Sequence, residues 1–387
     1  MKESSKKKDI YVELLRIIGC LMVIGTHIKL DGVINGKSDI VRTFVACAVG
    51  DGVAVFWVIL GFFFFEVDDY RMKLRNTIRK ILIPLGVYSV IMFFFYNWIV
   101  GNCGLRESII HSSQEYWNIL YYGLLRWQNV IPGCDHLWFL YVYVIVVLLY
   151  PALKGLHSYL NIYVSKDLTS KRKKYILLVV LLFIVLLAND ITINGLFEFS
   201  HHAFSASMAA GIYVLLGAFL YKNISTFKGD IKLGIIGGFG WMFINLIRSV
   251  IQYYMYSRVE ISEEPLFWFT SYALLSVICI VLFVFGCFGW IQKNEKTSLL
   301  VCSIGKTTMY IYIFHVAVND ILSNRFDIRN KILTYTGVVG IKVFIYEIIY
   351  GVVVFIASLI VSKILMYLKD IFFKSVKEIV RKKKLSD

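Results

Sequence analysis

Two ionisable residues, Arg16 and His27, lie inside the first long apolar stretch of the chain, residues 10–28. Their positions are related as i and i+11, about three turns of an α-helix, so both side chains project from one face. A guanidinium stays positively charged and binds anions, whereas an imidazole gains and loses a proton near neutral pH. The pair therefore predicts a helix with an anion-binding residue near one end and a general base near the other.

The same two residues have a plainer interpretation. Arg16 could reach the lipid phosphates on the cytoplasmic side or pair with Glu13, three positions earlier. His27 could then simply mark the outer end of the helix. Ionisable groups inside apolar segments are costly, however, and each is a functional candidate for that reason.

A further candidate, Asp51, opens the apolar segment 44–65 and is followed by Gly52 and Gly61. Glycines allow two helix backbones to approach closely. Asp51 is expected near the same outer level as His27, so its carboxylate could orient that imidazole, as carboxylates do in catalytic triads. The alternative is an interfacial carboxylate that caps the helix.

His136 begins the apolar segment 136–153, and Trp138 follows two positions later. We assign His136 to a catalytic group with His27 and Asp51, and Trp138 to a structural or substrate-channel role. The alternative is an aromatic belt at the membrane surface that includes a hydrogen-bonded histidine.

Tyr312 and His315 lie three positions apart in the segment 298–322, so they share one face of a helix. This segment is expected to enter the membrane from the cytoplasm, which places His315 at mid-membrane or beyond. A histidine at that depth is often a polar partner within the bundle, and we assign both residues structural or substrate-channel roles.

Composition places these residues in a membrane. Of 387 residues, 58% are hydrophobic and 17% are charged, and the apolar residues form long runs with only four prolines in the chain. A bilayer core needs roughly 20 apolar residues per helix. We predict an all-α polytopic transmembrane helix bundle of about ten spans, over residues 10–28, 44–65, 81–100, 136–153, 175–190, 207–221, 233–255, 265–290, 298–322 and 340–368.

Positive charge is concentrated beside alternate ends of these segments, and the formal net charge is +15. Cytoplasmic loops carry an excess of Lys and Arg, so both termini are predicted to be cytoplasmic. The predicted organisation is a basic tail (1–9), a transmembrane domain (10–368) and a second basic tail (369–387). Membrane lipids account for this charge without a nucleic-acid partner.

The seven cysteines do not follow the spacing of metal ligands, so no metal site is predicted. Cys103 and Cys134 both fall in the predicted outer loop 101–135. A disulfide there is one option, but the sequence does not fix the distance between the two residues.

Taken in order, these segments resemble the family 3 membrane acyltransferases, bacterial proteins that O-acylate surface sugars. The motifs that carry the resemblance extend over residues 16–315: Arg16 and His27; Gly52 to Gly61; Arg75, Arg79 and Lys80 before Pro84; His136 to Leu140 with Pro151; and Gly305, Thr308, Ile311, Tyr312 and His315. Two positions depart from the family pattern, and the basic cluster is spaced differently from the commonest Arg-x-x-Arg form. Ala54 stands where many members have an acid, as in the branch without a fused extracellular domain, and Leu60 replaces the usual serine.

The resemblance implies acyl-CoA, most commonly acetyl-CoA, as a donor that arrives from the cytoplasm. The acceptor would be a hydroxyl of a cell-surface or lipid-linked saccharide. Arg16, Arg75, Arg79 and Lys80 are then expected to bind the CoA phosphates through charge-assisted hydrogen bonds. His27 would act as a general base or carry the acyl group transiently, and both options stay open. The protein would be a multi-pass protein of a bacterial plasma membrane.

Two other classes of protein fit the same sequence. A transporter or flippase of a polysaccharide intermediate would line its path with the intramembrane charges, and some relatives of the family have been assigned export roles. A sensor or structural membrane protein would tolerate substitution of Arg16 and His27. Release of CoA in the presence of an acceptor sugar distinguishes the enzyme from both.

Overall fold

A computed structural model of the protein describes residues 9–28, 33–34, 37–38, 40–112, 133–165, 178–186, 202–224, 227–258, 270–336 and 341–386. Within these ranges the regular structure is helical, apart from two short antiparallel strands, β1 (Val33–Ile34) and β2 (Lys37–Ser38). The all-α prediction is therefore confirmed.

The helices follow one another along the chain with short turns between several of them. The first half contains α1 (Ile10–His27), α2 (Ile40–Gly50), α3 (Gly52–Phe64), α4 (Tyr70–Thr77), the π-helical turn η1 (Ile78–Leu82), α5 (Ile83–Ile99), the 3-10 turn η2 (Asp135–Leu137), α7 (Trp138–Leu148) and α8 (Tyr150–Ser165). The second half contains α10 (His202–Ile224), α11 (Ile231–Arg258), α12 (Thr270–Cys287), α13 (Gly289–Lys293), α14 (Glu295–Gly305), α15 (Thr308–Asp320), the π-helical turn η4 (Ile321–Arg325), α16 (Ile328–Thr336) and α17 (Ile341–Ser386).

Six helices among the described residues are long and apolar enough to cross a membrane, and two bent helix pairs raise the number to as many as eight. The prediction of about ten spans also included 175–190, of which residues 178–186 alone are described. It included 207–221 as well, which falls in a shorter apolar helix, Ala209–Ile224. The multi-pass helical architecture is confirmed, with six to eight candidate spans in this part of the chain.

Each of the two bent pairs has a distinctive residue near its bend, a proline in one and a glycine in the other. Between α7 and α8 the chain turns by 68°, and Pro151, the second residue of α8, lacks the amide hydrogen that a continuous helix would need. Between α14 and α15 it turns by 62° at Gly305. A Cβ atom at Gly305 would lie 2.1 Å from Oε2 of Glu13 on α1, so only glycine permits this approach. The bend thereby brings the start of α15 against α1.

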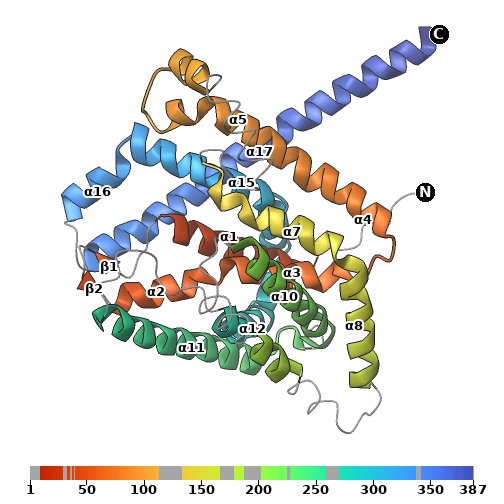
Figure 1. The fold of residues 1–387 in the computed structure, drawn as a ribbon, viewed down its shortest axis with the longest axis vertical. Helices are drawn as coiled ribbons and strands as arrows, with labels where there is room; N and C mark the ends of the chain where they lie inside the picture. Colours follow the sequence, from red (N-terminus) through yellow and green to blue (C-terminus); the bar gives the residue numbers. More distant parts are fainter. Residues whose placement is uncertain are drawn as a thin grey trace.

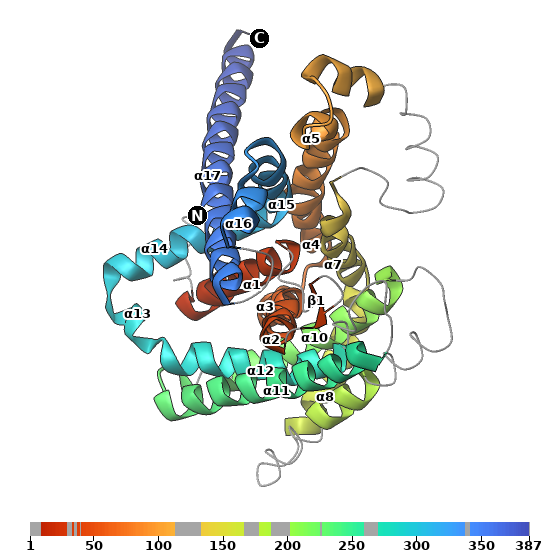
Figure 2. The ribbon, with the colours of Figure 1, turned by 90° about the vertical axis from the view of Figure 1, so that its left-hand side faces the viewer.

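Helices α1 and α3 lie in the middle of the bundle in both views (Figures 1 and 2). Helix α1 packs against α2, α3, α14, α15 and α17, and α3 packs against α10. Helix α11, paired with α12, exposes large apolar side chains, as expected for a surface that faces lipid acyl chains. The exposed residues on α11 include Ile236, Phe239, Met242 and Phe243.

Helix α17 continues past the predicted end of the transmembrane domain at residue 368 as one helix to Ser386, and its last part projects from the bundle (Figures 1 and 2). The first predicted tail lies almost wholly outside the described residues. The cytoplasmic location of both ends stays a prediction.

Candidate active site

His27, the last residue of α1, lies against two histidines that are distant in sequence. Its ring centroid is 5.9 Å from that of His136 and 5.0 Å from that of His315, and the latter two centroids are 5.1 Å apart. His136 and His315 are buried, whereas His27 is half-buried. We call these three residues the histidine cluster. Sequence analysis had singled out each of them, and the fold brings them together.

Main-chain carbonyls fix the two buried members of the histidine cluster. The Nε2–H of His136, on η2, donates to the carbonyl of Ile313 (3.0 Å), and the Nδ1–H of His315 donates to the carbonyl of Tyr312 (2.7 Å). The hydroxyl of Tyr312 donates in turn to the carbonyl of His136. These bonds tie η2 to α15, so Tyr312 supports the cluster from behind.

A cavity of about 250 Å³ lies beside His27. His27 is the member of the histidine cluster that lines it. The remaining lining comes from the end of α1, the second half of α15, η4 and α16. Two of these residues are apolar, Ile28 and Val316, and the others are polar: Asn319, Asp320, Ser323, Asn324 and Arg329. We call this space the polar cavity. Its amides, hydroxyl, carboxylate and guanidinium offer both donors and acceptors of hydrogen bonds.

Aromatic side chains pack along α1 between Arg16 and His27. A Cβ at Gly19 would lie 3.2 Å from the ring of Phe56 on α3. The Phe56 ring centroid is 5.9 Å from that of Phe139 and 6.3 Å from that of Tyr312. This part of the α1 surface is therefore apolar.

Trp138, predicted to have a structural or substrate-channel role, is half-buried on the first turn of α7. Its ring packs edge-on against Trp57 of α3, with 6.1 Å between the centroids. Trp138 is not among the residues that line the polar cavity.

Arg16 lies in the N-terminal half of α1, whereas His27 is its last residue. The Arg16 guanidinium donates to Oε1 of Glu13 at 2.8 Å. The ion pair that the sequence offered as a plain alternative is thus present. The Arg16 side chain keeps 31% of its surface exposed, whereas the Glu13 side chain keeps 4%. The guanidinium therefore has surface left for a second anion.

The other predicted CoA-binding residues form an exposed basic run. Arg75 lies in the last turn of α4, and Arg79 and Lys80 lie in η1, and all three side chains are exposed. Lys73 in the same run is engaged differently, because it donates to the carbonyl of Phe64 and lies over the rings of Phe64 and Tyr150. None of these basic residues is among those that line the polar cavity.

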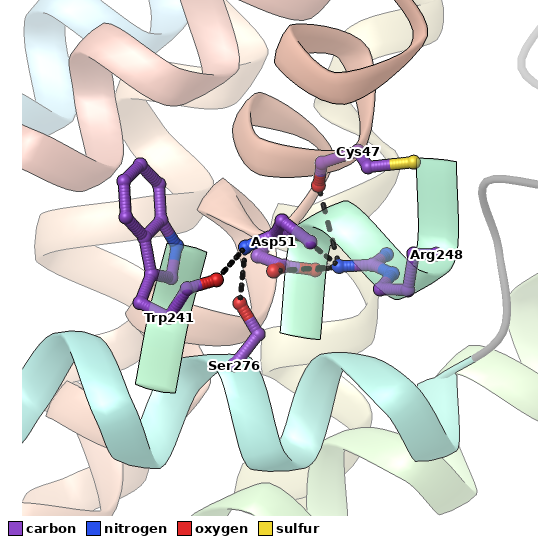
Figure 3. Close-up of polar contacts among 6 residues, drawn as sticks. Cys47, Asp51, Trp241, Arg248 and Ser276 are labelled. Atoms are coloured by element: carbon purple, nitrogen blue, oxygen red, sulfur yellow. Dashed lines mark hydrogen bonds and ion pairs between the residues drawn. The ribbon is translucent and has the colours of Figure 1, made fainter. Parts of the chain in front are cut away.

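Asp51 occupies a separate polar network. Both of its carboxylate oxygens accept hydrogen bonds from Nη1 of Arg248 on α11, at 2.9 and 2.8 Å (Figure 3). Arg248 also donates to Oδ1 of Asn245 (3.0 Å) and to the carbonyl of Cys47 (3.3 Å). Asn245 donates to the Ser276 hydroxyl (3.1 Å). We call these residues the Asp51 network.

The proposed orientation of His27 by Asp51 is therefore corrected. The carboxylate is 2% exposed and is directed at Arg248, which is itself 7% exposed. A buried carboxylate takes the strongest available partner, and a guanidinium outcompetes a neutral imidazole. Asp51 joins the α2–α3 junction to α11 instead.

Three polar residues of these two sites escaped sequence analysis: Arg248, Asp320 and Arg329. Arg248 could have been found, because it is an ionisable residue inside the predicted span 233–255. Asp320 follows His315 near the end of the ninth predicted span and carried the same signal. Arg329 lies in a polar stretch beyond that span, so no sequence signal distinguished it from other surface residues.

Among the described residues no group of three or more His, Cys, Asp or Glu side chains is arranged to hold a metal ion. Cys103 and Cys134 are both free thiols. The disulfide that the sequence left open does not form in this structure.

The structure defines a multi-pass helical membrane protein in which three imidazoles meet and one of them, His27, lines a polar cavity. A comparison with protein families agrees, since the acyltransferase-domain family matches residues 9–367. The chain belongs to the family 3 acyltransferases, and the resemblance drawn from its motifs is confirmed. No curated protein and no solved structure matches the chain significantly.

Proposed function

We propose that this membrane acyltransferase moves an acyl group, in the first instance acetyl, from acyl-CoA on the cytoplasmic side to a hydroxyl of a cell-surface or lipid-linked saccharide. The site would lie in the plasma membrane of a bacterium. The observation that carries the proposal is the position of His27, which lines the polar cavity and contacts two further imidazoles.

The polar cavity suits a hydroxyl-rich acceptor. Asn319, Asp320, Ser323, Asn324 and Arg329 provide donors and acceptors around one space, as sugar hydroxyls require. Ligand pockets commonly span about 300–1,000 Å³, and this cavity holds about 250 Å³. The volume favours insertion of one sugar unit over enclosure of a longer chain.

Acyl-CoA, the donor, would be held by positively charged side chains on the side of the membrane opposite to the polar cavity. CoA carries several phosphate charges, and Arg16, Arg75, Arg79 and Lys80 supply cations with exposed surface. Between Arg16 and His27 the surface of α1 at Gly19 is covered by Phe56, so an acyl chain would reach His27 only if this ring moved aside. The acyl group would then meet the acceptor hydroxyl at His27.

As a general base, His27 removes the proton of the acceptor hydroxyl while the oxygen attacks the thioester carbonyl. A carbon–oxygen bond forms, the carbon–sulfur bond breaks, and the proton held by His27 passes to the departing CoA thiolate. In the covalent alternative, a neutral nitrogen of His27 attacks the thioester carbonyl, and the carbon–sulfur bond breaks as CoA thiolate leaves. The acceptor hydroxyl then attacks the acyl-imidazole, the carbon–nitrogen bond breaks, and the hydroxyl proton passes to the thiolate.

The test uses membrane vesicles from cells that produce the protein and their native glycans, supplied with radiolabelled acetyl-CoA. Wild-type vesicles are expected to release CoA and to label the glycans. His27→Ala should lower transfer by about 10²–10⁴-fold, the usual contribution of a general base, while the protein still inserts. A transporter or flippase would release no CoA, and near-normal labelling by His27→Ala would remove this residue from the mechanism.

Mass analysis of surface glycans from cells with and without the gene provides the complementary readout. An increment of one acyl group per modified sugar, present with wild type and absent with His27→Ala, is the expected result. The mass of the increment identifies the acyl group, and fragmentation identifies the acceptor position.

A further inference from the structure

The histidine cluster contains two buried ring nitrogens that have no hydrogen-bond partner among the described residues, Nδ1 of His136 and Nε2 of His315. The two side chains are 3% and 1% exposed, so solvent does not compensate. More than nine in ten buried polar groups are hydrogen-bonded, and an exception therefore needs an explanation. Neither residue lines the polar cavity.

The bonds to main-chain carbonyls fix the tautomer of each ring. A carbonyl oxygen only accepts, so Nε2 of His136, bonded to Ile313, must carry hydrogen. Nδ1 of His315, bonded to Tyr312, must carry hydrogen for the same reason. A neutral imidazole has one N–H, and its second nitrogen is an acceptor. The two unpartnered nitrogens are therefore two lone pairs held within one cluster.

His27 lies between these lone pairs and the polar cavity. Its ring centroid is 5.0 Å from that of His315 and 5.9 Å from that of His136, and the same ring lines the cavity. In a catalytic triad an acceptor behind the base holds its second N–H. The two unpartnered nitrogens belong to rings that lie beside His27, although neither nitrogen accepts a hydrogen bond from a described residue in the structure itself. Catalytic hydrogen bonds often form only in the substrate complex. The acceptor here is an imidazole, because Asp51 is engaged by Arg248.

We propose that His136 and His315 are positioning residues for His27, and that its second N–H is accepted by one or the other of their free ring nitrogens once substrate is bound. The proposal rests on the function proposed above and explains how its base is oriented. One nitrogen of His27 faces the cavity as the free base, and the other is held from behind. Asp320 and Arg329 are the charged groups that line the cavity on the acceptor side.

Each proton in the proposed transfer step has a defined donor and acceptor. The acceptor hydroxyl gives its proton to the cavity-facing nitrogen of His27, and the resulting imidazolium keeps its second N–H bonded to His315 or His136. The oxygen bonds to the acyl carbon, the carbon–sulfur bond of acyl-CoA breaks, and the thiolate takes the proton from His27. His136 and His315 keep their own protons throughout, because main-chain carbonyls hold them.

Paired amide substitutions test the proposal, since Asn places a polar atom near the position of Nδ1 and Gln near that of Nε2. At residue 315 the free acceptor is Nε2, so His315→Gln should keep more activity than His315→Asn. At residue 136 the free acceptor is Nδ1, so His136→Asn should keep more activity than His136→Gln. The poorer member of each pair is expected to lose about 10–100-fold in kcat, with the KM for acetyl-CoA changed less than about two-fold.

A purely structural role predicts the opposite order. Retaining the bond to the main-chain carbonyl would then matter most, which favours Asn at residue 315 and Gln at residue 136. That reversed order, or equal kcat values within each pair, would overturn the proposal. All variants are polar and of similar size, so thermal unfolding of the detergent-purified proteins checks that their stabilities are comparable.

His157 provides a matched control, because it is a histidine stacked on Phe65 (4.2 Å between ring centroids) and contacts no member of the cluster. His157→Gln and His157→Asn should both keep wild-type kcat. Wild-type vesicles assayed in parallel separate the two hypotheses. No transfer by wild type contradicts the proposed function, whereas transfer that is indifferent to the four cluster variants contradicts only the positioning role.

Discussion

Two of the buried polar regions in the described part of the bundle differ in how completely their atoms are paired. In the Asp51 network, the carboxylate oxygens of Asp51 meet Arg248, and Arg248 also reaches Asn245 and a main-chain carbonyl. In the histidine cluster, His136 and His315 each keep one nitrogen without a partner among the described residues. The network is closed, whereas the cluster adjoins a cavity at His27.

Complete pairing of buried polar atoms indicates a role in stability, whereas incomplete pairing beside a cavity indicates a role in binding or catalysis. Buried charges that satisfy one another connect helices and leave nothing for a ligand, as in the link between the α2–α3 junction and α11. Polar atoms held in place but left unpaired lower stability, and they persist where a reacting group uses them. Sequence patterns pointed to Asp51 and His136 alike. The structure distinguishes them, because the Asp51 carboxylate is paired with Arg248 whereas Nδ1 of His136 has no partner in the described part of the chain.

Arg248→Leu should give the largest change in stability. It leaves the Asp51 carboxylate buried without its partner, which costs about 3–5 kcal/mol. Thermal unfolding in detergent measures the loss. The double variant Asp51→Leu/Arg248→Leu is expected to recover much of it, because no unpaired charge remains. Acetyl transfer by the double variant at a permissive temperature should persist, and a complete loss of transfer with normal stability would give Asp51 a chemical role after all.

Arg16→Ala extends the comparison to the N-terminal half of α1. Removal of a charged donor to a phosphate costs about 1.5–3 kcal/mol, so the apparent KM for acetyl-CoA should rise about 10–100-fold. Steady-state CoA release at varied acetyl-CoA concentration measures it. Glu13→Gln is the matched control, because it removes the charge that pairs with Arg16 and leaves the cation in place. An unchanged KM in Arg16→Ala would exclude the CoA-binding role of this residue.

Substitutions in the polar cavity should raise the KM for the acceptor glycan and leave the KM for acetyl-CoA unchanged. Asp320→Asn and Arg329→Gln each remove a charge from the lining. Loss of one hydrogen bond to a ligand typically costs about 0.5–1.5 kcal/mol, so the KM for the acceptor glycan should rise about two- to tenfold. Initial rates at varied glycan and fixed acetyl-CoA measure this effect. A rise in the KM for acetyl-CoA instead would assign the cavity to the donor.

Tyr312→Phe should have the smallest effect. It removes the hydroxyl that donates to the His136 carbonyl and leaves the ring packing in place. The expected loss of stability is about 1 kcal/mol, plus a modest fall in kcat because η2 is held less firmly. Thermal unfolding and CoA release measure the two effects. A loss in kcat as large as that of His27→Ala would show that the phenol takes part in the chemistry.

Much of the fold could be predicted because its signals are local. Apolar runs of about 20 residues suffice to define a membrane helix, and the predicted segments 10–28 and 44–65 correspond closely to Ile10–His27 and Thr43–Phe64. Bends were not predictable in the same way. The turn at Gly305 depends on Glu13 of a different helix, and no property of the segment 298–322 alone reveals it.

The sequence by itself determined the membrane class, the family and the identity of three histidines worth attention, since residue type and spacing along the chain carry those signals. Only the tertiary structure decided which polar groups meet. It joined His27 to residues 136 and 315, assigned Asp51 to Arg248 and made Asp320 and Arg329 part of one cavity. The physical reason is that a hydrogen bond or ion pair depends on distances of a few ångströms between segments far apart in sequence, which helix packing alone sets.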